Sequence, residues 1–324
     1  MPSSNYISKV AVVGAGGNVG RFITEALLNT GKHSVTAITR ADSKSIITPG
    51  AVAKHVDYND PSTIVEALND HDALVITLSG QAPIQETEEK LIRAAAEAGV
   101  PWILPNEWSP DTANEALVND VFVFKHKVAT RKLIEEIDKS AYISVATGFW
   151  YEYSLAIPLA YGIDIANRTA TFFDEGETKI STSTWQQVGR AVAALLSLPI
   201  KTEDASSQAC LNEYRNKVVY VSSFTIDQKA MWQSVLRVSG TKESDWTVSM
   251  EGARDRYETG LNEIKEGKRS GFAKMMFTRV FIDDGTGDFE NGKGTLNSVL
   301  GLPNEDLDEA TKRAIERVKE GKSF

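Results

Sequence analysis

The sequence Gly14-Ala15-Gly16-Gly17-Asn18-Val19-Gly20 decides the fold of this 324-residue chain. It follows the apolar run of residues 10–13, which is short and β-rich, as is typical of a buried parallel strand. It precedes residues 21–28, which place apolar side chains on one helical face. The glycines therefore lie in a turn between a strand and a helix. A turn without β-carbons lets backbone N–H groups and the positive helix end approach a pyrophosphate.

The glycine spacing differs from the plain dinucleotide pattern. It reads Gly14-x-x-Gly17-x-x-Gly20, and no acidic residue follows at the usual place. The context favours dinucleotide binding, because a strand precedes the turn, a helix follows it, and residues 34–39 form a second strand about 20 residues on. A purely structural glycine turn is the alternative.

Arg40 ends the second predicted strand. A carboxylate at this position would bind the ribose 2′-hydroxyl of NAD, whereas an arginine suits the 2′-phosphate of NADP. Ser43 and Lys44 follow and add further hydrogen-bond donors. We therefore expect NADP(H) as the cofactor, the alternative being that Arg40 is a solvated loop charge.

Composition limits the class of partner. The chain has 44 acidic and 35 basic residues, a formal net charge of −9, and 42% hydrophobic residues. This balance indicates a soluble globular protein and argues against nucleic acid as a partner. The single cysteine, Cys210, excludes an intramolecular disulfide and fits a reducing compartment. The four histidines lack the spacing of metal ligands, so we expect no metal.

Targeting and membrane signals are not evident. Residues 1–8 lack a basic segment followed by an apolar one, so no signal peptide is expected. The longest apolar stretch, near residues 191–200, has about half the length needed to span a bilayer. We expect a cytoplasmic protein without membrane contact.

Strands and helices alternate through the first half. Further strands are expected at residues 52–56, 73–78, 102–104 and 142–146, and helices at 61–69, before Gly99, and at 121–137. This alternation predicts an α/β fold with a doubly wound parallel sheet, an NADP-binding Rossmann domain over residues 1–150. Residues 151–324 are expected to form mainly a smaller α+β substrate lobe, with segments near 180–222 returning to the sheet. Residues 283–288 are expected to be a surface loop or a cover over the substrate.

In such sheets ligands bind at the carboxyl ends of the strands. This rule predicts that the cofactor-binding residues lie together at this edge of the sheet. They are Gly14, Gly16, Gly17, Asn18, Val19, Gly20, Arg40, Lys44, Asp57, Thr77, Leu78 and Ser79. The rule also brings the segments 105–108 and 147–150 to the same edge.

Hydride transfer to a substrate needs a group that polarises or protonates it. The tyrosine–lysine pair of many short-chain dehydrogenases is missing at the required position, which leaves the lysines of the helix expected at 121–137. The positions that share a helical face with Lys125 are apolar: Val128, Ala129 and Leu133. Those that share a face with Lys127 are polar: Thr130, Arg131 and Glu135. We therefore expect Lys125 to point inward and act as the acid or hydrogen-bond donor. Alternatively, both lysines are solvated or pair with Glu107 or Glu135.

Aromatic residues gather at the expected edge of the sheet. Together with Asn106, they predict a pocket for a flat, apolar substrate; the substrate residues are Asn106, Trp108, Gly148, Trp150, Tyr151 and Tyr153. Ordinary packing between the two lobes is the alternative.

These motifs resemble the NmrA-like and isoflavone reductase-like group of atypical short-chain dehydrogenase/reductases. The resemblance rests on the glycine turn, Arg40, the Pro105-x-Glu107-aromatic loop and the Lys-x-Lys-Val helix, and residues 103–110 are similar to fungal members of the CipA type. It implies an NADPH-dependent reductase in which Lys125 matches the catalytic lysine and Phe149 lies against the nicotinamide.

Two departures from the plant enzymes stand out. The plant Pro-Ser-Glu-Phe-Gly motif reads Pro105-Asn106-Glu107-Trp108-Ser109 here, and Thr147 replaces an asparagine. A lignan or isoflavone substrate is therefore not implied.

The function we expect is NADPH-dependent reduction of an aromatic or conjugated small molecule of secondary metabolism, by hydride transfer with a lysine assisting. A non-catalytic NADP(H)-binding redox sensor is the main alternative, and a structural dinucleotide-binding subunit is another. The expected partners are the small-molecule substrate and, as an open alternative, a second copy of the chain in a homodimer.

Overall fold

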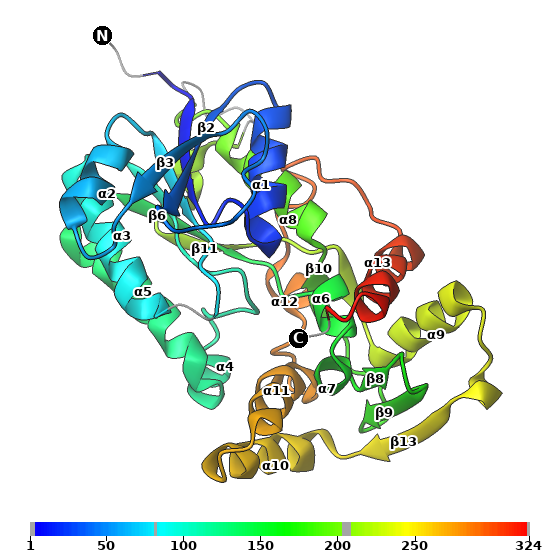
Figure 1. Ribbon diagram of the computed structural model, residues 1–324. Helices are drawn as coiled ribbons and strands as arrows, with labels where there is room; N and C mark the ends of the chain where they lie inside the picture. Colours follow the sequence, from blue (N-terminus) through cyan, green and yellow to red (C-terminus); the bar gives the residue numbers. More distant parts are fainter. Residues whose placement is uncertain (1–3, 81–82, 203–208, 323–324) are drawn as a thin grey trace.

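A computed structural model describes residues 4–80, 83–202 and 209–322. Residues 1–3 of the N-terminal stretch discussed above lie outside the described residues. A large sheet with helices on both faces forms one part of the molecule, and a second lobe of small sheets and short helices adjoins it (Figure 1).

The large sheet has seven parallel strands in the order β11-β6-β5-β4-β1-β2-β3. Their bounds are β1 (Lys9–Val13), β2 (Ser34–Arg40), β3 (Val52–Val56), β4 (Ala73–Ile76), β5 (Trp102–Leu104), β6 (Ala141–Ala146) and β11 (Lys217–Tyr220). Strand order runs outward in both directions from β1 and β4. The doubly wound Rossmann-type sheet is therefore confirmed, and the gap between two such halves is where ligands bind.

Both faces of the sheet are buried under helices. Successive side chains of β1 point to opposite faces of the sheet, so Val10 and Val12 belong to one apolar core and Ala11 and Val13 to another. The first core is covered by α1 (Asn18–Asn29) and α8 (Trp185–Leu196). The second is covered by α2 (Pro61–Leu68), α3 (Ile84–Glu97) and α5 (Lys125–Ile137).

Several element boundaries differ from the sequence expectation. Helix α2 begins as predicted, with the Asp60 carboxylate accepting the backbone N–H of Ser62 at 3.1 Å. The helix expected from residue 121 begins instead at Lys125. A 3-10 turn, η1 (Phe122–Phe124), precedes it and follows the short helix α4 (Glu115–Asp120).

The second lobe contains two small sheets, in the orders β12-β10-β7 and β13-β9-β8. Their strands are β7 (Phe149–Trp150), β8 (Ile163–Asp164), β9 (Thr169–Phe173), β10 (Ile180–Ser183), β12 (Phe224–Ile226) and β13 (Thr247–Glu251). The helices are α6 (Tyr151–Leu155), α7 (Pro158–Tyr161), α9 (Gln228–Ser239), α10 (Ala253–Lys265), α11 (Arg269–Thr278), α12 (Phe289–Lys293) and α13 (Leu307–Lys319). Of the segments expected to return to the large sheet, α8 and β11 do so, whereas β10 pairs with β7 and β12.

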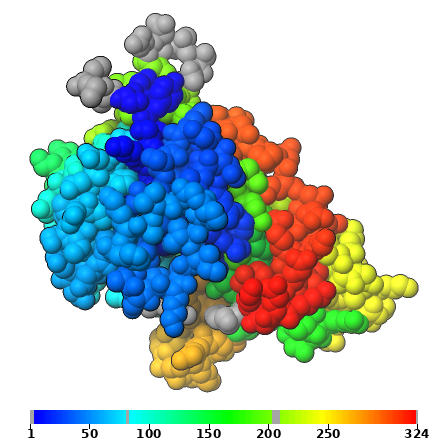
Figure 2. Space-filling view, turned by 45° about the horizontal axis from the view of Figure 1, so that its top comes forward, coloured from blue at the N-terminus to red at the C-terminus, as the bar shows by residue number. Residues whose placement is uncertain are grey.

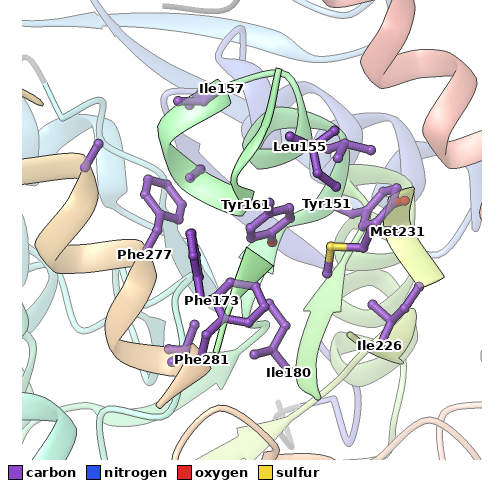
Figure 3. Close-up of a cluster of buried hydrophobic side chains, with 14 of the residues drawn as sticks. Tyr151, Leu155, Ile157, Tyr161, Phe173, Ile180, Ile226, Met231, Phe277 and Phe281 are labelled. Atoms are coloured by element: carbon purple, nitrogen blue, oxygen red, sulfur yellow. The ribbon is translucent and has the colours of Figure 1, made fainter. Parts of the chain in front are cut away.

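An aromatic core holds this lobe together (Figure 3). The ring of Tyr161 meets those of Phe277 and Phe281 edge to face, with centroids 6.3 and 5.7 Å apart. The loop expected over the substrate is tied to this lobe, because Arg279 pairs with Asp284 at 2.9 Å. The lobe therefore has a rigid core of its own.

The C-terminal helix α13 connects the two parts. In the space-filling view it lies, in red, beside the blue N-terminal segments and next to the yellow part of the second lobe (Figure 2). Within the described residues, no helix combines the length and the apolar composition needed to cross a bilayer.

Helices α1 and α8 cross so closely that one glycine is required. A β-carbon on Gly189 would lie 2.4 Å from the backbone oxygen of Phe22. We predict that Gly189→Ala lowers the free energy of unfolding by about 1–3 kcal/mol, because the helices must separate. Urea denaturation measures this change.

Gly292→Ala in α12 is the matched control, since no described atom lies within 4 Å of the added carbon. Its unfolding free energy should be unchanged or slightly raised. Equal losses in both variants would contradict the tight crossing.

Candidate functional site

The glycine turn is packed against the end of β4. Gly14 has a positive φ of 74°, and a β-carbon there would lie 2.1 Å from the backbone oxygen of Thr77. A β-carbon on Gly20 would lie 2.1 Å from the oxygen of Gly14, which accepts the Gly17 N–H at 2.8 Å. The Thr77 hydroxyl donates to the oxygen of Val13 at 2.7 Å. Close backbone packing thus fixes the turn at the N-terminus of α1.

A cavity of about 870 Å³ opens from this turn along the carboxyl ends of β1, β2, β3 and β4. It is lined by eight of the predicted cofactor residues: Gly14, Gly16, Gly17, Arg40, Asp57, Thr77, Leu78 and Ser79. The first turn of α1 carries no acidic side chain, so nothing there repels an anion. The cavity therefore extends from the N-terminus of α1, where an anion can bind, to Arg40, the residue predicted to bind the 2′-phosphate.

The remaining predicted cofactor residues lie elsewhere. Val19 and Gly20 are buried beneath the turn, where they support it. Asn18 and Lys44 are exposed and are not among the residues that line the cavity.

Arg40 has an exposed side chain at the cavity wall. Its Nε lies 3.5 Å from the Asp42 carboxylate, and the side chain is 63% exposed. Tyr58 lines the same wall, and burial raises the pKa of its hydroxyl, which the charge of Arg40 opposes. Tyr58 is a site residue that the sequence did not indicate, because no motif surrounds it.

The lysine that reaches inward is Lys127, so the expectation that Lys125 does so is wrong. Lys125 is exposed. The Nζ of Lys127 donates a hydrogen bond of 2.6 Å to the backbone oxygen of Asn106 and another to the backbone oxygen of Glu107. Two carbonyl oxygens therefore fix the position of this ammonium.

The buried face of α5 is polar, which explains the wrong choice. Arg131 pairs with Glu107 at 2.7 Å, and their side chains are only 9% and 1% exposed. Arg131 also donates to the hydroxyl and backbone oxygen of Thr112 at 2.7 and 3.0 Å. The apolar-face argument assumed an apolar interior along the whole helix. The first turns of α5 instead pack on the Arg131–Glu107 ion pair and its hydrogen bonds, and the apolar core begins further along the helix at Ile134.

Glu88 of α3 is a second buried carboxylate that the sequence reading missed. It accepts the backbone N–H of Asn106 at 2.7 Å and the hydroxyl of Thr130 at 3.2 Å. Its position could have been inferred, because it shares a helical face with the apolar residues Leu91 and Ile92.

Burial shifts the pKa values of Lys127 and Glu88. It lowers the pKa of Lys127 below its ordinary value, and the charges of Glu107 and Glu88 oppose that shift. Burial raises the pKa of Glu88, opposed by the hydrogen bond from Asn106 and by the charge of Lys127. A desolvated ammonium is a stronger hydrogen-bond donor and a better acid than a solvated one.

Three of the predicted substrate residues have structural contacts. The Asn106 side-chain oxygen accepts the N–H of Leu78 at 3.1 Å, and the Trp108 indole donates to the oxygen of Ile76 at 2.7 Å. Gly148 has a φ of 66°, and a β-carbon there would lie 2.0 Å from the oxygen of Ser181. These residues hold the end of β4 and the exit from β6.

The aromatic residues after β6 do not form one wall. The ring of Phe149 lies 4.4 Å from that of Phe277, centroid to centroid. Tyr151 is buried in the second-lobe core, where its hydroxyl lies 2.8 Å from that of Thr311 (Figure 3). Trp150 and Tyr153 both pack against Trp185. The cause is the start of α6, which turns successive side chains in different directions.

Comparisons with known proteins agree with this geometry. The NmrA-like family model matches residues 7–223. The oxidoreductase aprR of Aspergillus flavus is 28% identical over 306 residues, which cover 93% of this chain and 96% of that protein.

Solved structures share the fold. The NADPH-dependent quinone oxidoreductase QOR2 of Escherichia coli, complexed with NADPH, has a TM-score of 0.67 at 19% identity, covering 94% of this chain and 99% of that one. A structure from the pinoresinol-lariciresinol and phenylcoumaran benzylic ether reductases has a TM-score of 0.73 at 20% identity, covering 95% and 99%. The family model spans well over half of the chain, and the chain therefore belongs to the NmrA-like family.

Proposed function

We propose that this chain is an NADP(H)-dependent oxidoreductase that reduces a small molecule. The observation that carries the proposal is the cavity at the carboxyl ends of β1–β4, which runs from the glycine turn to Arg40. The names of the curated relatives and of the solved neighbours support it, since they are oxidoreductases and NADPH-dependent reductases.

The residues present fit the dinucleotide. Gly14 and Gly20 leave no room for β-carbons, and such a turn lets backbone approach a pyrophosphate at the N-terminus of α1. Arg40 is available for the 2′-phosphate because its side chain is largely exposed at the cavity wall. NADPH supplies a hydride to a bound substrate.

Lys127 is the group that we assign to the substrate side of the reaction. Its carbonyl partner Asn106 binds the backbone of Leu78, which lines the cavity, so a chain of contacts connects Lys127 to the cofactor pocket. A buried ammonium stabilises negative charge that develops on a substrate oxygen and can donate a proton to it.

An aromatic surface lies where the two lobes meet. Phe149 is half-buried and contacts Phe277 of the second lobe, which places an aromatic surface at the junction of the two lobes. We assign an aromatic or conjugated small molecule to this junction. Aromatic enones, ketones and imines are the compounds to screen for NADPH oxidation.

Arg40 is expected to set the choice between NADPH and NADH. Arg40→Ala should weaken NADPH binding about tenfold or more, because charge-assisted hydrogen bonds to the 2′-phosphate are lost. Calorimetric titration measures this, with NADH as the matched ligand whose affinity should not change. Equal affinity of the native protein for NADPH and NADH would contradict the assignment.

Substituting each lysine in turn distinguishes the role of Lys127 from that of Lys125. Lys127→Met should reduce turnover about 100-fold or more while NADPH still binds, since the donor to the substrate is removed. Lys125→Met is the matched control and should turn over normally, because Lys125 is exposed. Steady-state NADPH oxidation with a compound found in the screen gives both rates.

Normal turnover by Lys127→Met would refute its role. Tight NADPH binding with no turnover of any screened compound would instead favour the redox-sensor alternative.

A further inference from the structure

Glu88 differs from the other glutamates in the first turns of α3. Glu86 and Glu89 are exposed and pair with Lys90 and Arg93 one helical turn on, at 2.7 and 2.8 Å. Glu88 is only 1% exposed, and no cation of the described residues lies within 4 Å of its carboxylate. A buried carboxylate without a paired cation is costly, so its retention in the interior calls for a specific role.

Asn106 connects Glu88 to Lys127. Its N–H donates to Glu88 at 2.7 Å, and its backbone oxygen accepts the Lys127 ammonium at 2.6 Å. Its side-chain oxygen accepts the N–H of Leu78 at the cavity wall. One residue therefore links Glu88 to the ammonium through two hydrogen bonds and fixes both relative to the pocket.

The charges around Lys127 leave Glu88 as the unpaired partner. The titratable and charged groups that face Lys127 are Glu88 from α3, Glu107 from the loop after β5, and His126 and Arg131 from α5. Glu107 is paired with Arg131 at 2.7 Å, yet its charge raises the pKa of Lys127 more than the charge of Glu88 does, and Arg131 opposes it only in part. Glu88 is the second carboxylate acting on Lys127 and, among the described residues, has no cation within 4 Å. Burial lowers the pKa of His126, which favours its neutral form.

We propose that Glu88 is a positioning residue: acting through Asn106, it holds Lys127 in place and keeps it in the charged form that donates to substrate. The inference rests on the proposed function in one respect, the use of Lys127 as donor. Glu88 itself touches neither the cavity nor, by our assignment, the substrate.

The pKa directions agree with this geometry. Burial lowers the pKa of Lys127, and the charges of Glu107 and Glu88 raise it. Removing the charge of Glu88 therefore lowers the pKa of Lys127, so the ammonium loses its proton at a lower pH. A contact that mattered only for packing would leave this titration unchanged.

The test is Glu88→Gln. The amide keeps the size of the side chain and can still accept the Asn106 N–H, so the fold should persist. Glu89→Gln is the matched control, since Glu89 is the exposed neighbour of Glu88. Glu88→Asp keeps the charge and serves as the conservative variant.

The direct readout is the titration of Lys127 by ¹³C NMR of lysine-labelled protein, with the signal assigned by its loss in Lys127→Met. We expect Glu88→Gln to lower the pKa of Lys127 by about one unit or more. Glu88→Asp should move it less, and Glu89→Gln should not move it. An identical Lys127 titration in native protein and Glu88→Gln would overturn the proposal.

The kinetic readout is the pH profile of kcat/KM for NADPH oxidation. Because the charged lysine is the donor, the fall in rate at high pH should shift to lower pH in Glu88→Gln by the same amount. If the NMR titration shifts and the rate profile does not, Glu88 controls Lys127 as inferred, and the donor role of Lys127 under the proposed function is wrong.

Discussion

The close contact of Gly14 with the backbone of Thr77 is the constraint on which the site depends. It fixes the turn after β1 on the end of β4, and with it the start of α1 and the open end of the cavity. After β4 the chain continues to Leu78, whose N–H donates to the side-chain oxygen of Asn106 in the loop after β5. The backbone oxygen of Asn106 in turn accepts a hydrogen bond from the Lys127 ammonium. One backbone contact thus aligns the anion-binding helix end with the buried ammonium.

The buried charged side chains near the carboxyl ends of the strands are held by one ion pair and by hydrogen bonds. Glu107 and Arg131 satisfy each other and Thr112, so their desolvation is offset by hydrogen bonds within the network. Glu88 and Lys127 are joined instead through the peptide groups of Asn106. The first pair joins the loop after β5 to α5, and the second joins the same loop to α3 and α5.

The backbone geometry of the site could be predicted from the sequence, whereas its buried polar contacts could not. The glycine turn, the parallel strands beside it and the place of Arg40 at a strand end follow local rules of spacing, so they could be predicted. Lys127 could not, because a helical face with Thr130 and Arg131 resembles a solvated one unless the partner Glu107 is known. The hairpin of α10 and α11 was also missed; its two helices approach backbone to backbone at Gly260 and Gly271.

The central claim is that the cavity running from the glycine turn to Arg40 binds the dinucleotide, with the nicotinamide directed toward Lys127 behind Leu78 and Asn106. A crystal structure of the complex with NADP⁺ tests it most directly. The account predicts the pyrophosphate at the N-terminus of α1, the 2′-phosphate at Arg40, and the nicotinamide on the side of the pocket where Leu78 and Lys127 lie. A dinucleotide bound elsewhere, or a nicotinamide directed away from Lys127, would contradict it.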